Sequence, residues 1–185
     1  MIYRDHQLKV LVISCELFPG HETRNLRLAI ELISRGYDVT HTGPSQAMAD
    51  ENFSGSMFPA SFEKDERACR ANTRLFSSWR ELRSLIDNTG IVLFGTSKHY
   101  LSVSRYAHEE GKIVIQHQDA SAMHKWSAYK PDLVSVRSVF DRERMEHFGI
   151  AKKEAIHITG SVGSDDAAEE NQKIDRDELC KKYGF

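Results

Sequence analysis

Short apolar runs alternate with helical segments along this chain, and that alternation restricts its fold more than any other feature. "LKVLVIS", Leu8 to Ser14, is a nearly continuous apolar run, as expected of a strand buried on both faces of a sheet. Thr23 to Arg35 then place apolar side chains at helical spacing, and Gly36 stands where a left-handed residue ends a helix. "YDVTHT" returns to strand character directly afterwards. This region therefore predicts a strand, a helix and a second parallel strand.

The same alternation continues to residue 159. We expect further strands at Ile91–Gly95, Lys112–Gln116, Asp132–Val136 and Ala155–Thr159, and helices at about Lys98–Glu110 and Val139–Phe148. The pattern predicts an α/β domain with three layers and a mostly parallel sheet of six strands. In such a sheet, ligands bind in loops beyond the carboxyl ends of the strands.

Two segments interrupt this alternation. Gln46–Phe62 has little periodicity, so we expect an irregular segment with a short strand near Met57–Phe58. Ala68–Ile86 reads as one helix, with Leu75, Trp79, Leu82 and Ile86 on one stripe and arginines around it. We expect that stripe to pack on the sheet. The alternative is that the basic helix touches an anionic membrane peripherally.

Composition excludes several classes of protein. The formal net charge of -2 gives no basic excess for nucleic-acid binding. The three cysteines lie far apart and form no C-x-x-C pair, and the nine histidines offer no i, i+4 pair with a third ligand, so we expect no metal site. No apolar run approaches the roughly 18 residues of a membrane span, and the N-terminus is too polar for a signal peptide. We therefore expect a cytoplasmic protein.

Two stretches carry a resemblance to a known family. "FPGHETRNLRLAIELISRGYDVTHTGPS" resembles the first strand-loop-helix-strand unit of GT-B glycosyltransferases, and "DLVSVRSVFDRERMEHFGIAKKEAIHITGSVGSDD" is similar to the last such unit of their N-terminal half. The resemblance, to family-4-like or family-1-like members, implies a Rossmann-like acceptor-side domain over residues 1–163. Residues 164–185 would then be a linker and the start of a C-terminal nucleotide-sugar domain that the chain does not contain.

The resemblance also implies two candidate histidines. In the family-1-like branch, a G-H-x-x-P loop carries a histidine that acts as general base, and His21 occupies that place, although Arg24 stands where the proline would be. An imidazole suits the task because its unperturbed pKa of roughly 6.5 lets it accept a proton near neutral pH. In the family-4-like branch, a histidine commonly followed by aspartate lines the cleft, and His117 with Asp119 resembles that pair at a spacing of one extra residue.

Other residues at the expected strand ends could bind an acceptor or a phosphate. Gly20 permits close approach of a ligand to backbone amides near a helix N-terminus. Arg24 and Asn25 lie on the first turn of the expected helix, where a guanidinium could hold a phosphate or carboxylate. Gly95 and Thr96 repeat the strand-glycine-helix arrangement. Each has a structural alternative: Arg24 as a solvated side chain and Thr96 as a helix cap.

Together, the sequence and the resemblance predict transfer of a sugar from a nucleotide sugar to an acceptor hydroxyl, with His117 or His21 nearest the chemistry. We expect no cofactor beyond the nucleotide sugar as co-substrate. Expected partners are a glycan or lipid-linked acceptor and a C-terminal domain or partner chain, without which the chain would be inactive. The alternatives are a sugar-nucleotide 2-epimerase-like domain and a noncatalytic acceptor-binding subunit. A dinucleotide-binding oxidoreductase is disfavoured because the first loop has no G-x-G-x-x-G.

Overall fold

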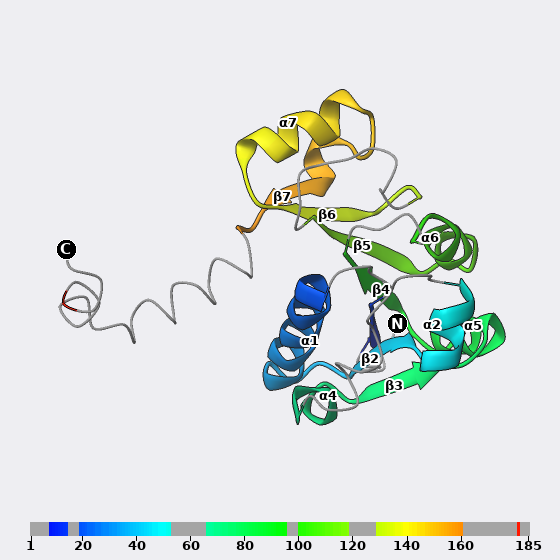
Figure 1. Cartoon of the computed structure of the whole chain (residues 1–185). Coiled ribbons are helices and arrows are strands. Elements are labelled where there is room, and N and C mark those ends of the chain that lie inside the picture. The colour runs from blue at the N-terminus through cyan, green and yellow to red at the C-terminus, as the bar shows by residue number, and fades with distance from the viewer. Residues whose placement is uncertain are drawn as a thin grey trace, which may run out of the picture.

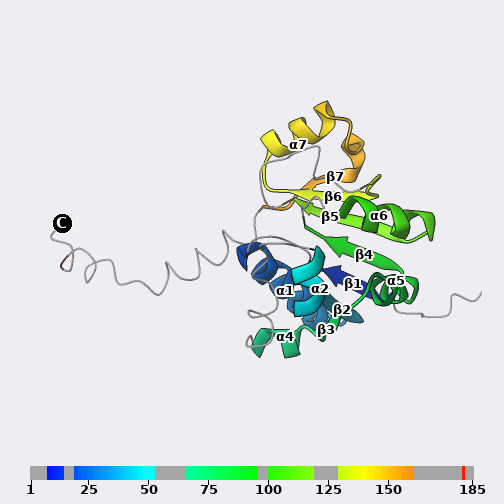
Figure 2. The ribbon, with the colours of Figure 1, turned by 45° about the vertical axis from the view of Figure 1, so that its right-hand side comes forward.

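The computed structural model describes residues 8–14, 19–52, 66–95, 100–118, 129–160 and 181. These residues form one seven-stranded sheet with helices on both faces (Figures 1 and 2). The strands are β1 (Val10–Ile13), β2 (Val39–Pro44), β3 (Thr73–Phe76), β4 (Ile91–Phe94), β5 (Ile113–Gln118), β6 (Leu133–Val136) and β7 (Ile156–Ile158). Their spatial order is β3-β2-β1-β4-β5-β6-β7, and every neighbouring pair is parallel. The expected α/β fold with three layers is confirmed.

Helices cover the two faces unequally. On one face, α1 (Pro19–Ser34) packs on β1, and α4 (Glu66–Arg70) joins the same apolar cluster. The opposite face carries α2 (Gln46–Asn52), α5 (Trp79–Asp87), α6 (Tyr100–Glu109) and α7 (Val139–His147). Figure 1 shows α1 and α4 on one side of the sheet and α2, α5 and α6 on the other. Among the described residues, the apolar cluster under α1 and α4 extends as far as Ile115 of β5 and includes no residue of β6 or β7.

The centre of the sheet is buried on both faces. All four residues of β1 are buried; Val10 and Val12 contribute to the cluster under α1, and Leu11 and Ile13 to the cluster under α5 and α6. This arrangement is what the continuous apolar run predicted for a central parallel strand.

The expected single helix over Ala68–Ile86 is wrong. The segment folds instead as α4, the edge strand β3 and α5. Asn72 ends α4 with a positive φ of 50°, and Thr73 then lies opposite His41 of β2. Ser78 caps α5 by accepting a hydrogen bond from the backbone N–H of Glu81. The backbone of Thr73–Phe76 pairs with β2, a segment far away in the sequence. The spacing of apolar residues within the segment cannot reveal this pairing.

The four residues of the expected apolar stripe do not lie on one helix face. Leu82 and Ile86 are buried in the core as expected, but Leu75 lies on β3 and the Trp79 side chain is 40% exposed. The long basic helix on which the membrane alternative rested is therefore not formed. No helix in the described ranges is long and apolar enough to cross a membrane.

Two further boundaries differ from the expectation. Helix α1 begins at Pro19 rather than at Thr23, because proline is favoured at the first helical position, where no N–H donor is needed. The segment expected to be irregular after Ser45 begins with helix α2, whose Ala49 N–H donates to the Ser45 carbonyl at 2.8 Å. The strand expected near Met57–Phe58 and the division of the chain at residue 163 lie outside the described residues.

Candidate functional site

The direction in which the chain crosses the sheet changes between β1 and β4. From β1 it proceeds to β2 and β3 on one side, and from β4 to β7 on the other. Open parallel sheets bind ligands at the carboxyl ends of the strands that flank such a reversal. Ser14 follows β1 there and Gly95 follows β4, and both residues are buried.

A buried polar network holds the end of β1. The Ser14 Oγ lies 2.8 Å from Nε2 of His41 on β2, and His41 Nδ1 lies 3.0 Å from Thr73 Oγ1 on β3. From α1, the Asn25 amide donates to Ser14 Oγ at 3.1 Å and to the Ile13 carbonyl at 3.4 Å. The side chain of Asn25 is thus directed at β1, and the network ties α1 to three strands.

Burial keeps the His41 imidazole neutral. Its pKa is lowered from 6.5 to about 3 because the charged form would lose its hydration in the interior. A neutral imidazole donates from one ring nitrogen and accepts at the other. It can therefore bridge the hydroxyl groups of Ser14 and Thr73.

His117 lies within β5 rather than in a loop after it. The strand extends to Gln118 because His117 and Gln118 pair with Ser135 and Val136 of β6. The His117 side chain is only 7% exposed, and its Nδ1 lies 2.5 Å from the Ser135 hydroxyl oxygen. His157 of β7 is opposite Ser135 in turn, so these three polar residues form a row across three strands.

A hollow of about 270 Å³ opens beside this row, on the face that α1 only partly covers. Its lining consists of Leu28, Leu93, Ile115, His117, Ser135, Thr159 and Gly160. The wall thus combines the aliphatic side chains of Leu28, Leu93 and Ile115 with the polar side chains of His117, Ser135 and Thr159. Sequence reasoning missed Ser135; only the register between β5 and β6 brings it to His117.

A larger hollow, of about 540 Å³, lies on the opposite face between α5 and the first three strands. Lys9, Asp38, Asn72 and Asn88 line one end of it, at the amino-terminal ends of these strands. Since ligands of open parallel sheets bind at the carboxyl ends, we assign the candidate site to the smaller hollow.

The remaining predicted site residues occupy several places. Gly20 and His21 lie in the first turn of α1 rather than in a loop before it. Arg24 is half-buried on the same helix. The side chain of His21 and both Thr96 and Asp119 lie outside what the structure describes. Within the described residues, no group of three histidine, cysteine or acidic side chains could hold a metal ion.

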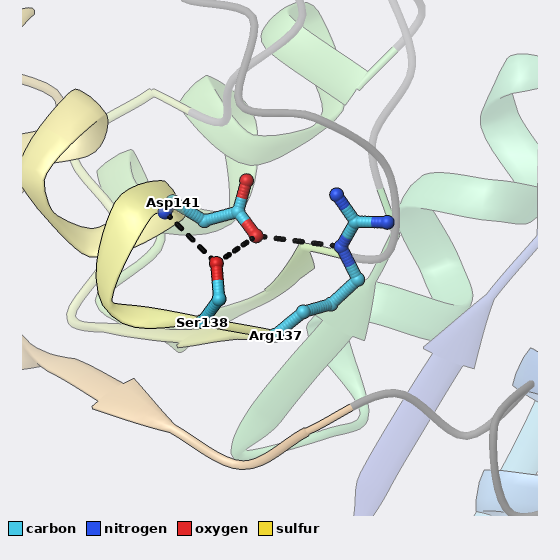
Figure 3. A network of polar contacts seen from close by, with 3 residues as sticks. All are labelled: Arg137, Ser138 and Asp141. Atoms are coloured by element: carbon cyan, nitrogen blue, oxygen red, sulfur yellow. Dashed lines mark hydrogen bonds and ion pairs between the residues drawn. The ribbon is translucent and has the colours of Figure 1, made fainter.

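A second polar cluster stands where β6 leads into α7 (Figure 3). Ser138 caps α7: its Oγ accepts from the Asp141 backbone N–H at 3.2 Å and donates to Asp141 Oδ2 at 2.9 Å. Arg137 Nε lies 3.4 Å from the same carboxylate oxygen. Ser138 is thus the N-cap of α7.

Comparison with known proteins shows the fold and leaves the family open. No protein-family model matches the sequence, and no curated protein matches it significantly. The structure is similar to Anabaena HepE, solved in complex with UDP and glucose, with a TM-score of 0.55 and 9% sequence identity. The match covers 83% of this chain and 44% of HepE, so the chain has the fold of one half of a GT-B glycosyltransferase.

A second likeness is to an imine reductase variant from Myxococcus stipitatus in complex with NAD+, with a TM-score of 0.39 and 12% identity. It covers 90% of this chain and 60% of the reductase. At that TM-score the likeness supports no conclusion about this chain.

Proposed function

We propose that this chain is the acceptor-side domain of a glycosyltransferase that moves a sugar from a nucleotide sugar to an acceptor hydroxyl. The observation that carries this proposal is the position of His117 near the carboxyl end of β5, bonded to Ser135 and lining the small hollow. The similarity to half of HepE supports it, because HepE was solved with UDP and glucose.

In the proposed reaction, the acceptor oxygen forms a bond to the anomeric carbon while the bond from that carbon to the phosphate oxygen breaks. The nucleoside diphosphate leaves, and the hydroxyl proton must pass to a base. We assign the role of that base to the imidazole of His117. Ser135 would orient the ring through its contact with Nδ1, as a bonded partner of one ring nitrogen fixes the tautomer of a histidine.

The chain spans 44% of HepE, and we assign the nucleotide-sugar site mainly to a second domain outside this chain. The acceptor would then enter the hollow beside His117 and meet the donor across a cleft between the two domains. His21 is the rival base, since the first turn of α1 also belongs to the carboxyl-terminal edge of the sheet.

The test uses the parent protein, with a second Rossmann-like domain supplied in the same chain or as a partner, and UDP-glucose as the first donor. We expect His117→Ala to lower kcat by about 10²-fold or more, as loss of a general base does. His157→Ala is the matched control, because His157 belongs to the same row but is exposed. Unchanged turnover in His117→Ala with loss in His21→Ala would transfer the role to His21.

The assay also separates the alternative functions. If UDP is released and the sugar is epimerised without a glycosylated product, the 2-epimerase-like function is favoured. Absence of turnover, together with tight binding of an acceptor to this chain, would favour the noncatalytic subunit.

A further inference from the structure

Arg137 is anchored at the carboxyl end of β6 by a buried carboxylate. It directly follows Val136, the last residue of the strand, and its Nε lies 3.4 Å from Asp141 Oδ2. The Asp141 side chain is only 2% exposed and is fixed in turn by the Ser138 hydroxyl. The guanidinium is therefore held near its base by a group that cannot readily move.

This anchoring leaves most of the guanidinium available. Figure 3 shows Arg137 facing Asp141 through Nε, with one terminal nitrogen on the side opposite Asp141. Among the carboxylates that the structure describes, Asp141 alone pairs with Arg137, and the Arg137 side chain remains 35% exposed. A guanidinium presents its donors in a fixed fork that matches a phosphate or a carboxylate. Here the contact with Asp141 uses the Nε–H direction, and the side chain remains partly exposed.

The pair differs in setting from two other i, i+4 pairs, Arg35–Glu31 and Arg142–Glu146. Both partners of Arg35–Glu31 are substantially exposed, at 67% and 55%, whereas Arg142 and Glu146 are each 32% exposed and the two atoms that face each other, Nε and Oε1, are buried. An exposed pair such as Arg35–Glu31 lies on the surface and needs no role beyond solvation. Arg137 stands instead at the strand end where parallel sheets bind ligands.

Arg137 is also close in the fold to the candidate site. Ser135, two residues earlier, lines the hollow and bonds to His117. On the other side, the Thr159 N–H donates to the Val136 carbonyl at 2.9 Å, and Thr159 lines the same hollow. The residue that precedes Arg137 is thus joined directly to the lining of the site.

We propose that Arg137 is an anion-binding, specificity-determining residue of this site and takes two oxygens of a phosphate or carboxylate on the ligand. Two sources share this chemistry: the diphosphate of a nucleotide sugar and an acidic group on the acceptor. The assignment of either source rests on the proposed function, whereas the anion site itself can be measured without transfer.

The first experiment measures binding of inorganic pyrophosphate and of UDP to the 185-residue chain by NMR and calorimetry. We expect the backbone amides of Val136, Ser138 and Thr159 to shift. Arg137→Gln should weaken binding about tenfold, as loss of a hydrogen bond to a charged group does. Arg142→Gln is the matched control, because it removes an arginine from another i, i+4 pair on the same segment.

Arg137→Lys keeps the positive charge but loses the paired N–H donors of the guanidinium. We therefore expect its affinity for pyrophosphate and UDP to lie between those of the wild type and Arg137→Gln. Thermal melting of each variant shows whether the cap of α7 is intact, since Asp141 keeps its contacts with Ser138.

The second experiment separates the two sources in the parent enzyme. A higher KM for the nucleotide sugar in Arg137→Gln identifies the diphosphate, and a higher KM for the acceptor alone identifies an acidic acceptor. Unchanged pyrophosphate and UDP affinity together with unchanged KM values would overturn the anion site and leave the proposed transfer intact. Pyrophosphate binding that depends on Arg137, in a protein that transfers no sugar, would uphold the anion site and overturn the transfer.

Discussion

The hydroxyl oxygen of Ser14 lies 2.8 Å from Nε2 of His41, which joins the end of β1 to the middle of β2 inside the protein. Both side chains are fully buried, and His41 also contacts Thr73 of the edge strand β3. The network needs a neutral imidazole, since a charged ring would have to be buried without its water. The stability of the domain should therefore depend on pH through His41.

We expect stability to fall as the pH drops below 6.5. The pKa of His41 is 6.5 in the unfolded chain and about 3 in the folded one, so the unfolded state binds the extra proton between these values. Above pH 6.5 this group contributes no pH dependence, and below it the loss approaches about 1.4 kcal/mol per pH unit. Urea unfolding at about pH 7.5, 6, 5 and 4, values on both sides of the unperturbed pKa, measures how the free energy of unfolding changes with pH.

His41→Gln keeps a neutral polar side chain and cannot titrate in this range. The variant should be less stable at neutral pH but should lose less stability on acidification than the wild type. If both proteins show the same slope below pH 6.5, His41 is not the titrating group.

Asn25→Ala should destabilise the fold by about 1–3 kcal/mol, because the buried acceptors Ser14 Oγ and the Ile13 carbonyl each lose a donor. Chemical denaturation provides the measurement. Asn88→Ala is the control: its amide donates to the Ser84 carbonyl at an exposed helix end, and its loss should cost much less. Similar costs for the two variants would mean that the Asn25 network contributes little.

Ser138→Ala should cost about 0.5–2 kcal/mol through loss of the α7 cap. The cost should lie toward the upper part of that range, since the buried Asp141 carboxylate also loses its hydroxyl donor. Ser84→Ala in the exposed middle of α5 should be close to neutral. Equal stability of Ser138→Ala and the wild type in urea would argue against the cap seen in Figure 3.

Phe76→Ala should be among the most costly substitutions in the first half of the sheet, at about 3–5 kcal/mol, because Phe76 is fully buried at the end of β3. Trp79→Ala should cost less, since its ring is 40% exposed and contacts Phe76 only at a centroid distance of 6.3 Å. A single helix with Trp79 in its buried stripe would give Trp79→Ala a cost comparable to that of Phe76→Ala.

Local signals in the sequence predicted most elements of the sheet. The run that includes Val10–Ile13 is apolar at every position, so it could only be stable with both faces covered. Gly36 and Gly149 follow helices with positive φ, as expected of residues that end them. Ser138 caps α7 because its hydroxyl reaches an N–H three residues later, a purely local interaction.

Other features depended on partners far away in the sequence. Thr73–Phe76 became a strand because β2 supplied hydrogen bonds, although its own spacing favoured a helix. The sequence offered His117 as a candidate site residue, but its contact with Ser135 required the β5–β6 register, which fixes the face on which each side chain lies. The sequence predicted Asn25 as a ligand-binding residue, but its amide donates to Ser14 Oγ at the end of β1.

The sequence by itself determined that this chain forms a parallel α/β sheet, because apolar periodicity, helix caps and glycines act over a few residues. The tertiary structure alone decided which distant polar residues meet: Ser14 with His41, and His117 with Ser135. The physical reason is that strand order and register are set by packing between distant segments, and a one-residue change in register would turn each side chain to the opposite face.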